Sequence, residues 1–103
     1  MVRYGSMTIN EYYRLPLHRE LREKLGLKEK SEVSLQPIGN IVILQKSNTE
    51  IFTKQYFFGS VDEIGKIELP YELMRTVGWR KKDSISVYSV DDYMLILKLN
   101  MDD

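Results

Sequence analysis

The stretch GKIELPYELMRTVGW, Gly65 to Trp79, decides the fold because it contains a strand, a helix and both boundaries of that helix. KIEL alternates polar and apolar residues, which predicts a short strand. Pro70 suits the first helical position, where its missing N–H costs nothing. Leu73 and Val77 lie four residues apart and share one helical face. Gly78 is suited to end the helix in a left-handed conformation. The stretch therefore predicts a strand, a short helix and a stop.

Strand patterns flank this stretch on both sides. The segment EIFTKQYFFGSV, Glu50 to Val61, is rich in β-branched and aromatic residues and predicts a strand. DEIG then predicts a turn in which Gly65 takes a positive φ. After the helix, SISVYSV and YMLILKL predict a hairpin that turns at Asp91-Asp92. The second half of the chain thus reads β-β-α-β-β.

The first half carries the same pattern 52 residues earlier. Leu17, Leu21 and Leu25 repeat at helical spacing, and Gly26 suits the helix end. Glu20 and Lys24 are predicted to form an i,i+4 ion pair. VSLQPIGNIVIL predicts a hairpin that turns through PIGN. In the last strand, the alignment of the two halves allows a slip of one residue. The matched pairs are Arg14/Lys66, Leu15/Ile67, Leu17/Leu69, Glu20/Glu72, Leu21/Leu73, Leu25/Val77, Gly26/Gly78, Leu27/Trp79 and Val33/Ile85.

This internal similarity predicts two copies of one unit, at about 1–48 and 49–103. A unit of about fifty residues buries too little surface to be stable by itself. We therefore expect the two copies to close on each other into one compact domain, 1–103, with a pseudo-two-fold barrel.

Composition limits the classes of protein that fit the chain. The 103 residues are 43% hydrophobic and 29% charged, an ordinary globular mixture that argues against disorder. Fifteen basic and 15 acidic residues cancel, which excludes a highly basic nucleic-acid coat but allows a basic face. The absence of cysteine excludes disulfides and thiolate chemistry. No apolar stretch has the length of a signal peptide or membrane span, so we expect a cytoplasmic protein without a membrane partner.

Val61 to Lys98, VDEIGKIELPYELMRTVGWRKKDSISVYSVDDYMLILK, resembles the SpoVT–AbrB superfamily of bacterial transition-state regulators. The family pattern places a V-D pair, a turn glycine, a basic residue, a proline, a helix and a glycine in this order. The first half is looser, because His18 stands where the family has proline. The resemblance implies a mainly β fold with short helices, in which tandem β-β-α-β-β units form a swapped-hairpin (double-split) β-barrel. It also implies transcriptional regulation through double-stranded DNA.

This sequence has a basic residue at only some of the positions where the family pattern has one. The resemblance implies DNA-binding roles for Arg14, Arg22, Lys66 and Arg75. These four cations are expected on one side of the molecule if the barrel has two-fold symmetry. The family's other basic helix positions hold Glu23 and Met74, and its basic first-strand position falls near Gly59.

Each candidate also has a plainer interpretation. The four cations, and the turn RKKD at 80–83, are also consistent with solvated surface charge. His18, the only histidine, is expected to cap or pack at a helix start. Trp79 is expected in the core, and Asp62-Glu63 and Asp91-Asp92 in turns. The aromatic residues that suit either base stacking or the core are Tyr12, Tyr13, Tyr56, Phe57 and Phe58.

Two other classes of function are alternatives to DNA binding. An enzyme is not expected, because the sequence holds no nucleophile–base set, no metal-ligand spacing and no phosphate loop. We accordingly expect no catalytic residue, metal or cofactor. The alternative is a protein-interaction or oligomerisation module, or an antitoxin-like barrel with weak or no DNA binding. Antitoxins of this barrel type add a toxin-wrapping tail, whereas only a few residues follow the last predicted strand, so a toxin partner is not expected. The sequence leaves monomer and homodimer open.

Overall fold

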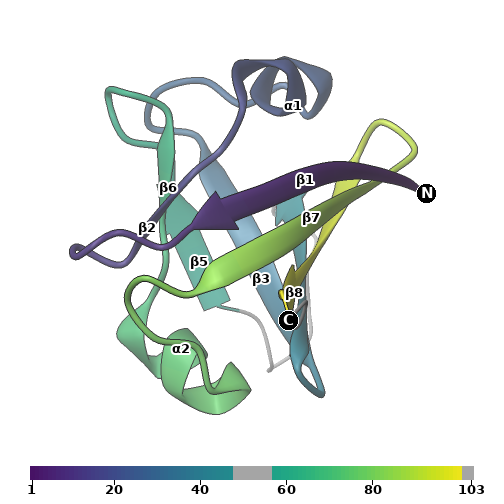
Figure 1. The fold of residues 1–103 in the computed structure, drawn as a ribbon. Helices are drawn as coiled ribbons and strands as arrows, with labels where there is room; N and C mark the ends of the chain where they lie inside the picture. The colour runs from purple at the N-terminus through teal and green to yellow at the C-terminus, as the bar shows by residue number, and fades with distance from the viewer. Residues whose placement is uncertain (48–56, 101–103) are drawn as a thin grey trace.

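A computed structural model describes residues 1–47 and 57–100 (Figure 1). The described elements are β1 (Val2–Thr8), β2 (Arg14–Pro16), α1 (Arg19–Lys24), β3 (Glu32–Ile38), β4 (Ile41–Lys46), β5 (Phe57–Ser60), β6 (Lys66–Glu68), α2 (Tyr71–Val77), β7 (Ser84–Val90) and β8 (Met94–Leu99). The prediction of a mainly β fold with short helices is confirmed. The order β-β-α-β-β occurs twice along the chain.

Among the described strands, more pairings join the two halves than join strands within one half. One sheet has the order β1-β7-β8-β4-β3-β5, and β2 and β6 form a separate two-stranded ribbon. All the pairings are antiparallel. Each half places its first strand beside the hairpin of the other half, as β1 beside β7 and β5 beside β3. This is the swapped arrangement that the sequence predicted, and the strand order reads the same when the halves are exchanged.

Two pairs of residues mark the pseudo-two-fold axis. Leu15 pairs with Ile67 at the centre of the β2–β6 ribbon, and the two are 52 positions apart. Ile43 pairs with Ile96 at the centre of β4 and β8, where the spacing is 53. Exchanging the halves maps each pair onto itself. The β2–β6 ribbon and the β4–β8 pair therefore lie at opposite ends of the axis. That the halves are copies of one unit stays a prediction.

The core forms because apolar residues on the strands and helices of both halves point to one interior. Leu15 and Ile67 are fully buried, as are Leu21 of α1 and Leu73 of α2. The buried side chains form one cluster with members from each half. Burying each side chain of this size contributes roughly 1.5–3 kcal/mol. Trp79 lies in this core, as predicted, at 4% exposure.

The boundaries of α2 differ from the prediction by one position. Pro70 is the N-cap, with φ −61° and ψ 140°, rather than the first helical residue. An N-cap residue keeps an extended backbone while its carbonyl accepts the first helical hydrogen bond, here from the Met74 N–H at 3.2 Å. Gly78 ends the helix at φ 76°, in the predicted left-handed conformation.

The first helix also needs correction. α1 spans only Arg19–Lys24, so Leu17 and Leu25 flank the helix, although both are buried. The predicted Glu20–Lys24 pair is wrong, because the Lys24 Nζ lies 3.8 Å from the Asp92 Oδ1. The i,i+4 ion pair on this helix is Arg19 Nε to Glu23 Oε1, at 3.0 Å. His18 is the N-cap, but its side chain makes no capping hydrogen bond.

The two hairpins turn over different lengths. The first turn is limited to 39–40, because Pro37 and Ile38 belong to β3 and Ile38 pairs with Ile41. The second turn includes Tyr93 as well as Asp91-Asp92, and Val90 pairs with Met94 across it. Asp91 there takes a φ of 52°. The extra turn residue explains the change of spacing from 52 to 53 in the last strand.

The predicted strand Glu50–Val61 is described only from Phe57 onward. β5 covers Phe57–Ser60, and Val61 follows it with an isolated bridge to Ile67. The remainder of that strand, Tyr56 and the boundary between the proposed units lie outside the described residues, as do residues 101–103. Among the described helices, neither has the length or apolar character to cross a bilayer.

Candidate functional site

Two equivalent turns present the first candidate cations. In the turn before β2, the Asn10 Oδ1 accepts hydrogen bonds from the backbone N–H groups of Tyr12 and Arg14, at 2.8 and 3.0 Å. In the turn before β6, the Asp62 Oδ1 accepts from Ile64 and Lys66, at 3.0 and 2.8 Å. Such side-chain to backbone bonds fix a tight turn. Each turn leads directly into a strand whose first residue is basic, Arg14 in β2 and Lys66 in β6.

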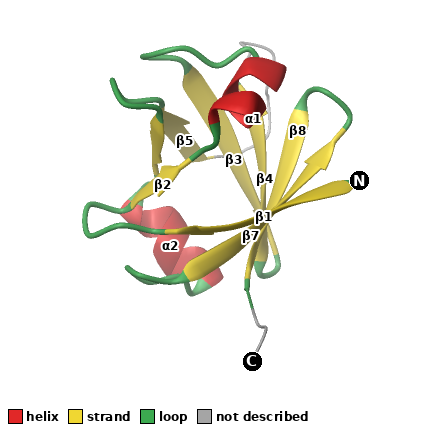
Figure 2. Ribbon diagram, turned by 45° about the horizontal axis from the view of Figure 1, so that its top comes forward, coloured by secondary structure: helices red, strands yellow, loops and turns green. Residues whose placement is uncertain are grey.

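The β2–β6 ribbon turns these basic residues outward. Strand side chains alternate between faces, and the central Leu15 and Ile67 are fully buried. Arg14 and Lys66 flank this pair and so lie on the outer face, each partly exposed. The helices lie at opposite ends of the ribbon, α1 above and α2 below in Figure 1, and Figure 2 shows the same separation from another side. Two of the four predicted DNA-binding cations, Arg14 and Lys66, thus lie on the outer face of the ribbon.

Arg14 is engaged in an ion pair across the two halves. Its Nη1 lies 2.9 Å from the Asp62 Oδ2, and the two side chains are 39% and 13% exposed. Burial favours a higher pKa for the Asp62 carboxyl, but the N–H groups of Lys66 and Ile64, together with Arg14, hold its pKa below the ordinary value. Asp62 therefore stays ionised and fixes both its own turn and Arg14.

Lys66 has no corresponding counter-ion among the residues that the structure describes. The residue 52 positions before Asp62 is Asn10, whose amide carries no charge. Within 1–47 and 57–100, no ion pair of the Lys66 side chain is recorded. The turn geometry repeats between the halves, but the charge does not. Lys66 is consequently the more available of the two ribbon cations.

Arg22 packs against the turn that precedes β6. Its Nε donates to the Leu17 carbonyl at 3.1 Å. A Cβ built on Gly65 would lie 2.4 Å from the guanidinium carbon of Arg22, so the guanidinium covers this glycine. The Gly65 φ of 83° agrees with the predicted turn. The structure thus brings Arg22 close to the turn that carries Lys66.

The position where the family often has a basic first-strand residue cannot hold a side chain here. A Cβ on Gly59 would lie 2.3 Å from the backbone oxygen of Glu68 and 3.3 Å from a methyl of Leu35. Backbone oxygen cannot move aside as a flexible side chain can. The close approach of β5 to the end of β6 therefore explains why this position is glycine.

Arg75 lies on the exposed side of α2, at the other end of the ribbon from α1. Its side chain is 66% exposed, with Nη1 3.9 Å from the Glu72 Oε1, too long and too solvated for a strong pair. Its guanidinium carbon lies 6.0 Å from the centre of the Tyr71 ring. Arg75 therefore borders a different feature, an open pocket beside α2.

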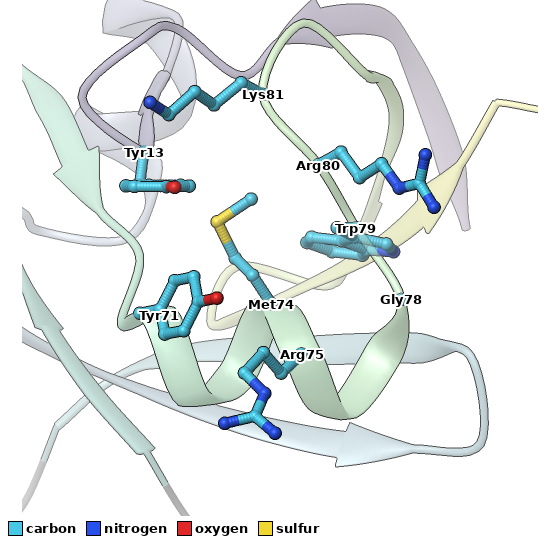
Figure 3. A pocket seen from close by; sticks show the side chains of 8 residues that line it. All are labelled: Tyr13, Tyr71, Met74, Arg75, Gly78, Trp79, Arg80 and Lys81. Atoms are coloured by element: carbon cyan, nitrogen blue, oxygen red, sulfur yellow. The ribbon is translucent and has the colours of Figure 1, made fainter.

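This pocket, which we call the α2 pocket, measures about 500 Å³. Its lining residues are Tyr13, Tyr71, Met74, Arg75, Gly78, Trp79, Arg80 and Lys81. Figure 3 shows Met74 in the middle, the two tyrosines on one side, and Trp79 with Arg80 on the other. The tyrosine rings meet edge to face, with centres 5.8 Å apart and planes at 72°. The Lys81 Nζ stands 4.9 Å from the centre of the Tyr13 ring.

Sequence reasoning missed both the ion pair and the pocket. The turn RKKD is predicted as a solvated turn, and Arg80 and Lys81 are indeed exposed, but they also line the α2 pocket. Of the aromatic candidates, Phe57 packs against the core, Tyr13 is partly buried, and Tyr12 and Phe58 are exposed. The basic residues after Gly78 were a visible signal. Their proximity to Tyr13 was not, because more than sixty residues separate them in sequence.

Comparison with known proteins gives a partial sequence match and a fold match. No protein-family model matches the chain. A stretch of 38 residues is 50% identical to the transition state regulatory protein AbrB of Bacillus subtilis (strain 168), covering 37% of this chain and 38% of AbrB. The match thus spans well under half of AbrB. The solution structure of PHS018 from Pyrococcus horikoshii covers 97% of this chain and 94% of its own, with a TM-score of 0.51 and 19% identity, a similarity of fold alone.

Proposed function

We propose that the protein is an AbrB-like transcriptional regulator that binds duplex DNA with the face centred on the β2–β6 ribbon. The observation that carries this proposal is Lys66, an outward cation on the ribbon with no carboxylate partner in the described ranges. The partial identity to AbrB, a transition state regulator by name, supports the same conclusion.

The four candidate cations contribute differently in this proposal. Lys66 and the exposed Arg75 contact phosphates directly, because neither is held by a strong ion pair. Arg14 and Arg22 each use one N–H group within the protein, on Asp62 and on the Leu17 carbonyl. An arginine has five N–H donors, so each keeps several for phosphate oxygens or guanine edges. Arg14 and Arg22 therefore position the turn and also extend the cationic face.

A duplex-binding assay at several salt concentrations tests this function. Four phosphate contacts give a slope of log affinity against log salt of about −3.6. Replacing Lys66→Ala together with Arg75→Ala is expected to weaken binding and to reduce the magnitude of the slope by about 1.8. Electrophoretic mobility shift with one duplex at a series of salt concentrations measures both quantities.

The matched control removes the same charge from the opposite end of the pseudo-two-fold axis. Lys46 on β4 and Lys98 on β8 are exposed strand residues away from the ribbon. The Lys46→Ala/Lys98→Ala protein should keep the parental slope. Equal losses in both double variants would show only a general charge effect and would remove the ribbon from the interface.

The second candidate function is an interaction or oligomerisation module without DNA binding. The zero net charge and the use of Arg14 in an ion pair favour it. This alternative predicts no mobility shift even at low salt, and a molar mass by light scattering above that of one chain. We propose no catalytic role, since Asp62 is bound as a carboxylate by Arg14 and by backbone N–H groups and AbrB is a regulator.

A further inference from the structure

The α2 pocket combines an apolar floor, aromatic walls and a cationic rim. Met74 and Trp79 are buried, at 1% and 4% exposure, and their side chains line the pocket. Tyr71 is 57% exposed and meets Tyr13 edge to face. Positive charge comes from Arg75, Arg80 and Lys81. A ligand that satisfies such a site has a flat apolar part and an anionic part.

The cations at the pocket are not neutralised by the protein around them. Apart from the long Arg75–Glu72 contact, no carboxylate pairs with the side chains of Arg75, Arg80 or Lys81 in the described ranges. Asp83 is nearby, but its Oδ2 accepts the backbone N–H of Arg80 at 2.8 Å. The Lys81 ammonium faces the Tyr13 ring instead of an acid. The rim therefore retains positive charge for a ligand.

We propose that the α2 pocket binds a single nucleotide whose base is unpaired. The base lies against the exposed Tyr71 ring and the partly buried Tyr13 ring, above Met74 and Trp79. The basic side chains around the rim, those of Arg80, Lys81 and Arg75, attract the phosphate. Aromatic side chains beside a cationic track are the usual means by which proteins hold unpaired bases. Pocket volumes of a few hundred Å³ are typical for small ligands, and about 500 Å³ falls within that range. A base within an intact duplex has both faces stacked and cannot enter.

The equivalent positions of the other half do not form a second nucleotide-binding pocket. The position equivalent to Tyr13 is Gly65, 52 residues later, and the position equivalent to Tyr71 is Arg19, 52 residues earlier. Arg22 stands in place of Met74, and its guanidinium already covers Gly65. Glu23 and Glu29 replace Arg75 and Lys81. The first half therefore lacks the aromatic walls and carries acids at the rim, so the site belongs to one half only.

This site shares Arg75 with the proposed duplex face, but its other residues allow it to be tested separately. Arg75 belongs to both proposals and is therefore left unchanged in the test. Trp79 is the only tryptophan of the chain, so its fluorescence reports on the pocket alone. The probes are a short single-stranded oligothymidylate, thymidine monophosphate, inorganic phosphate, and a closed hairpin duplex. The first two present an unpaired base, phosphate presents only the anion, and the duplex presents only paired bases.

The unaltered protein should show saturable quenching of Trp79 by the oligothymidylate. Quenching by thymidine monophosphate as well would identify a free nucleotide as a sufficient ligand, and quenching by the oligonucleotide alone would identify a strand. Both results support the proposal. Quenching by inorganic phosphate at the same concentrations, equal quenching by the closed duplex, or no quenching would each overturn it.

Two variants test the two parts of the pocket. Tyr71→Ala should weaken oligothymidylate binding roughly fivefold or more, because one base stacked on an aromatic ring contributes about 1–3 kcal/mol. Tyr71→Phe should restore it. Arg80→Ala with Lys81→Ala should reduce the magnitude of the salt slope by about 1.4. Because these side chains lie at the surface, both variants should fold, and unchanged binding in both would remove the pocket from the interaction.

Matched controls separate this result from the duplex interface. Lys28→Ala changes the residue 52 positions before Arg80, and Tyr93→Ala removes a tyrosine that is 54% exposed on a distant turn. Both should bind the oligothymidylate normally. Lys66→Ala should also leave Trp79 quenching unchanged while weakening duplex binding. Loss of quenching in Lys66→Ala would show that one surface serves both ligands and would overturn a separate pocket.

Discussion

Asp62 shows how one residue supports both local and distant structure. One carboxylate oxygen accepts two backbone N–H groups within its own turn, and the other pairs with Arg14 from the other half. The Arg14 Nε is buried and has no hydrogen-bond acceptor in the described ranges. The positive charge of Arg14 is therefore balanced mainly by the Asp62 carboxylate. The residue thereby joins the two turns that carry the candidate cations.

The Asp62→Asn protein is expected to be less stable at neutral pH by about 1 kcal/mol, because the amide keeps an oxygen for the turn but loses the charge opposite a partly exposed Arg14. The folded state lowers the Asp62 pKa from 3.8. Its stabilisation is therefore fully present above that value and is lost as the pH falls through the lower pKa of the folded state. Urea unfolding of both proteins from neutral to acid pH should show the difference shrinking. Glu63→Gln, an exposed neighbour, is the control, and a difference that persists undiminished in acid would contradict the assignment.

At the scale of elements, the close approach of β5 to the end of β6 fixes the shape of the ribbon. Gly59 sits where the Glu68 carbonyl leaves no room for a side chain. β5 continues into Val61, which bridges to Ile67 of the ribbon. A tight contact between two backbones, at Gly59 and Glu68, thus lies beside the ribbon that carries Lys66.

Gly59→Ala is expected to destabilise the protein by about 2 kcal/mol, because the added methyl overlaps backbone that cannot move alone. Ser60→Ala, on the exposed side of the same strand, should change stability by less than about 0.5 kcal/mol. Thermal or urea unfolding compares the two variants. If Gly59→Ala unfolds at the same midpoint as Ser60→Ala, the close approach does not constrain β5.

At the scale of the whole molecule, the halves depend on each other. Of the six strand pairings within residues 1–47 and 57–100, four join one half to the other: β1–β7, β2–β6, β3–β5 and β4–β8. Only the hairpins β3–β4 and β7–β8 are formed within a half. An isolated hairpin is marginal in water, and the core cluster draws on both halves. The pseudo-two-fold fold is therefore expected to form as one unit.

Separate production of residues 1–47 and 48–103 tests this dependence. Each fragment alone should lack a cooperative thermal transition, since its strands lose their partners and much of their burial. Mixing the fragments should restore β-type circular dichroism and a cooperative transition. A monomeric fragment that unfolds cooperatively by itself would show that its half has an independent core.

The sequence by itself determined the local pattern of this protein: a mainly β chain, short helices followed by the left-handed glycines Gly26 and Gly78, a turn at Gly65, and the burial of Trp79. These features follow from the spacing of apolar residues and from the backbone freedom of glycine, which act over a few neighbouring residues. The α2 boundary differed by one residue, because Pro70 takes the extended conformation typical of an N-cap. Only the tertiary structure decided that Asp62 neutralises Arg14, that Arg22 covers Gly65, and that Lys81 meets Tyr13 at the α2 pocket. Those contacts join positions tens of residues apart in sequence. A local sequence pattern does not indicate that such residues are close, because the pairing and register of strands from the two halves bring them together.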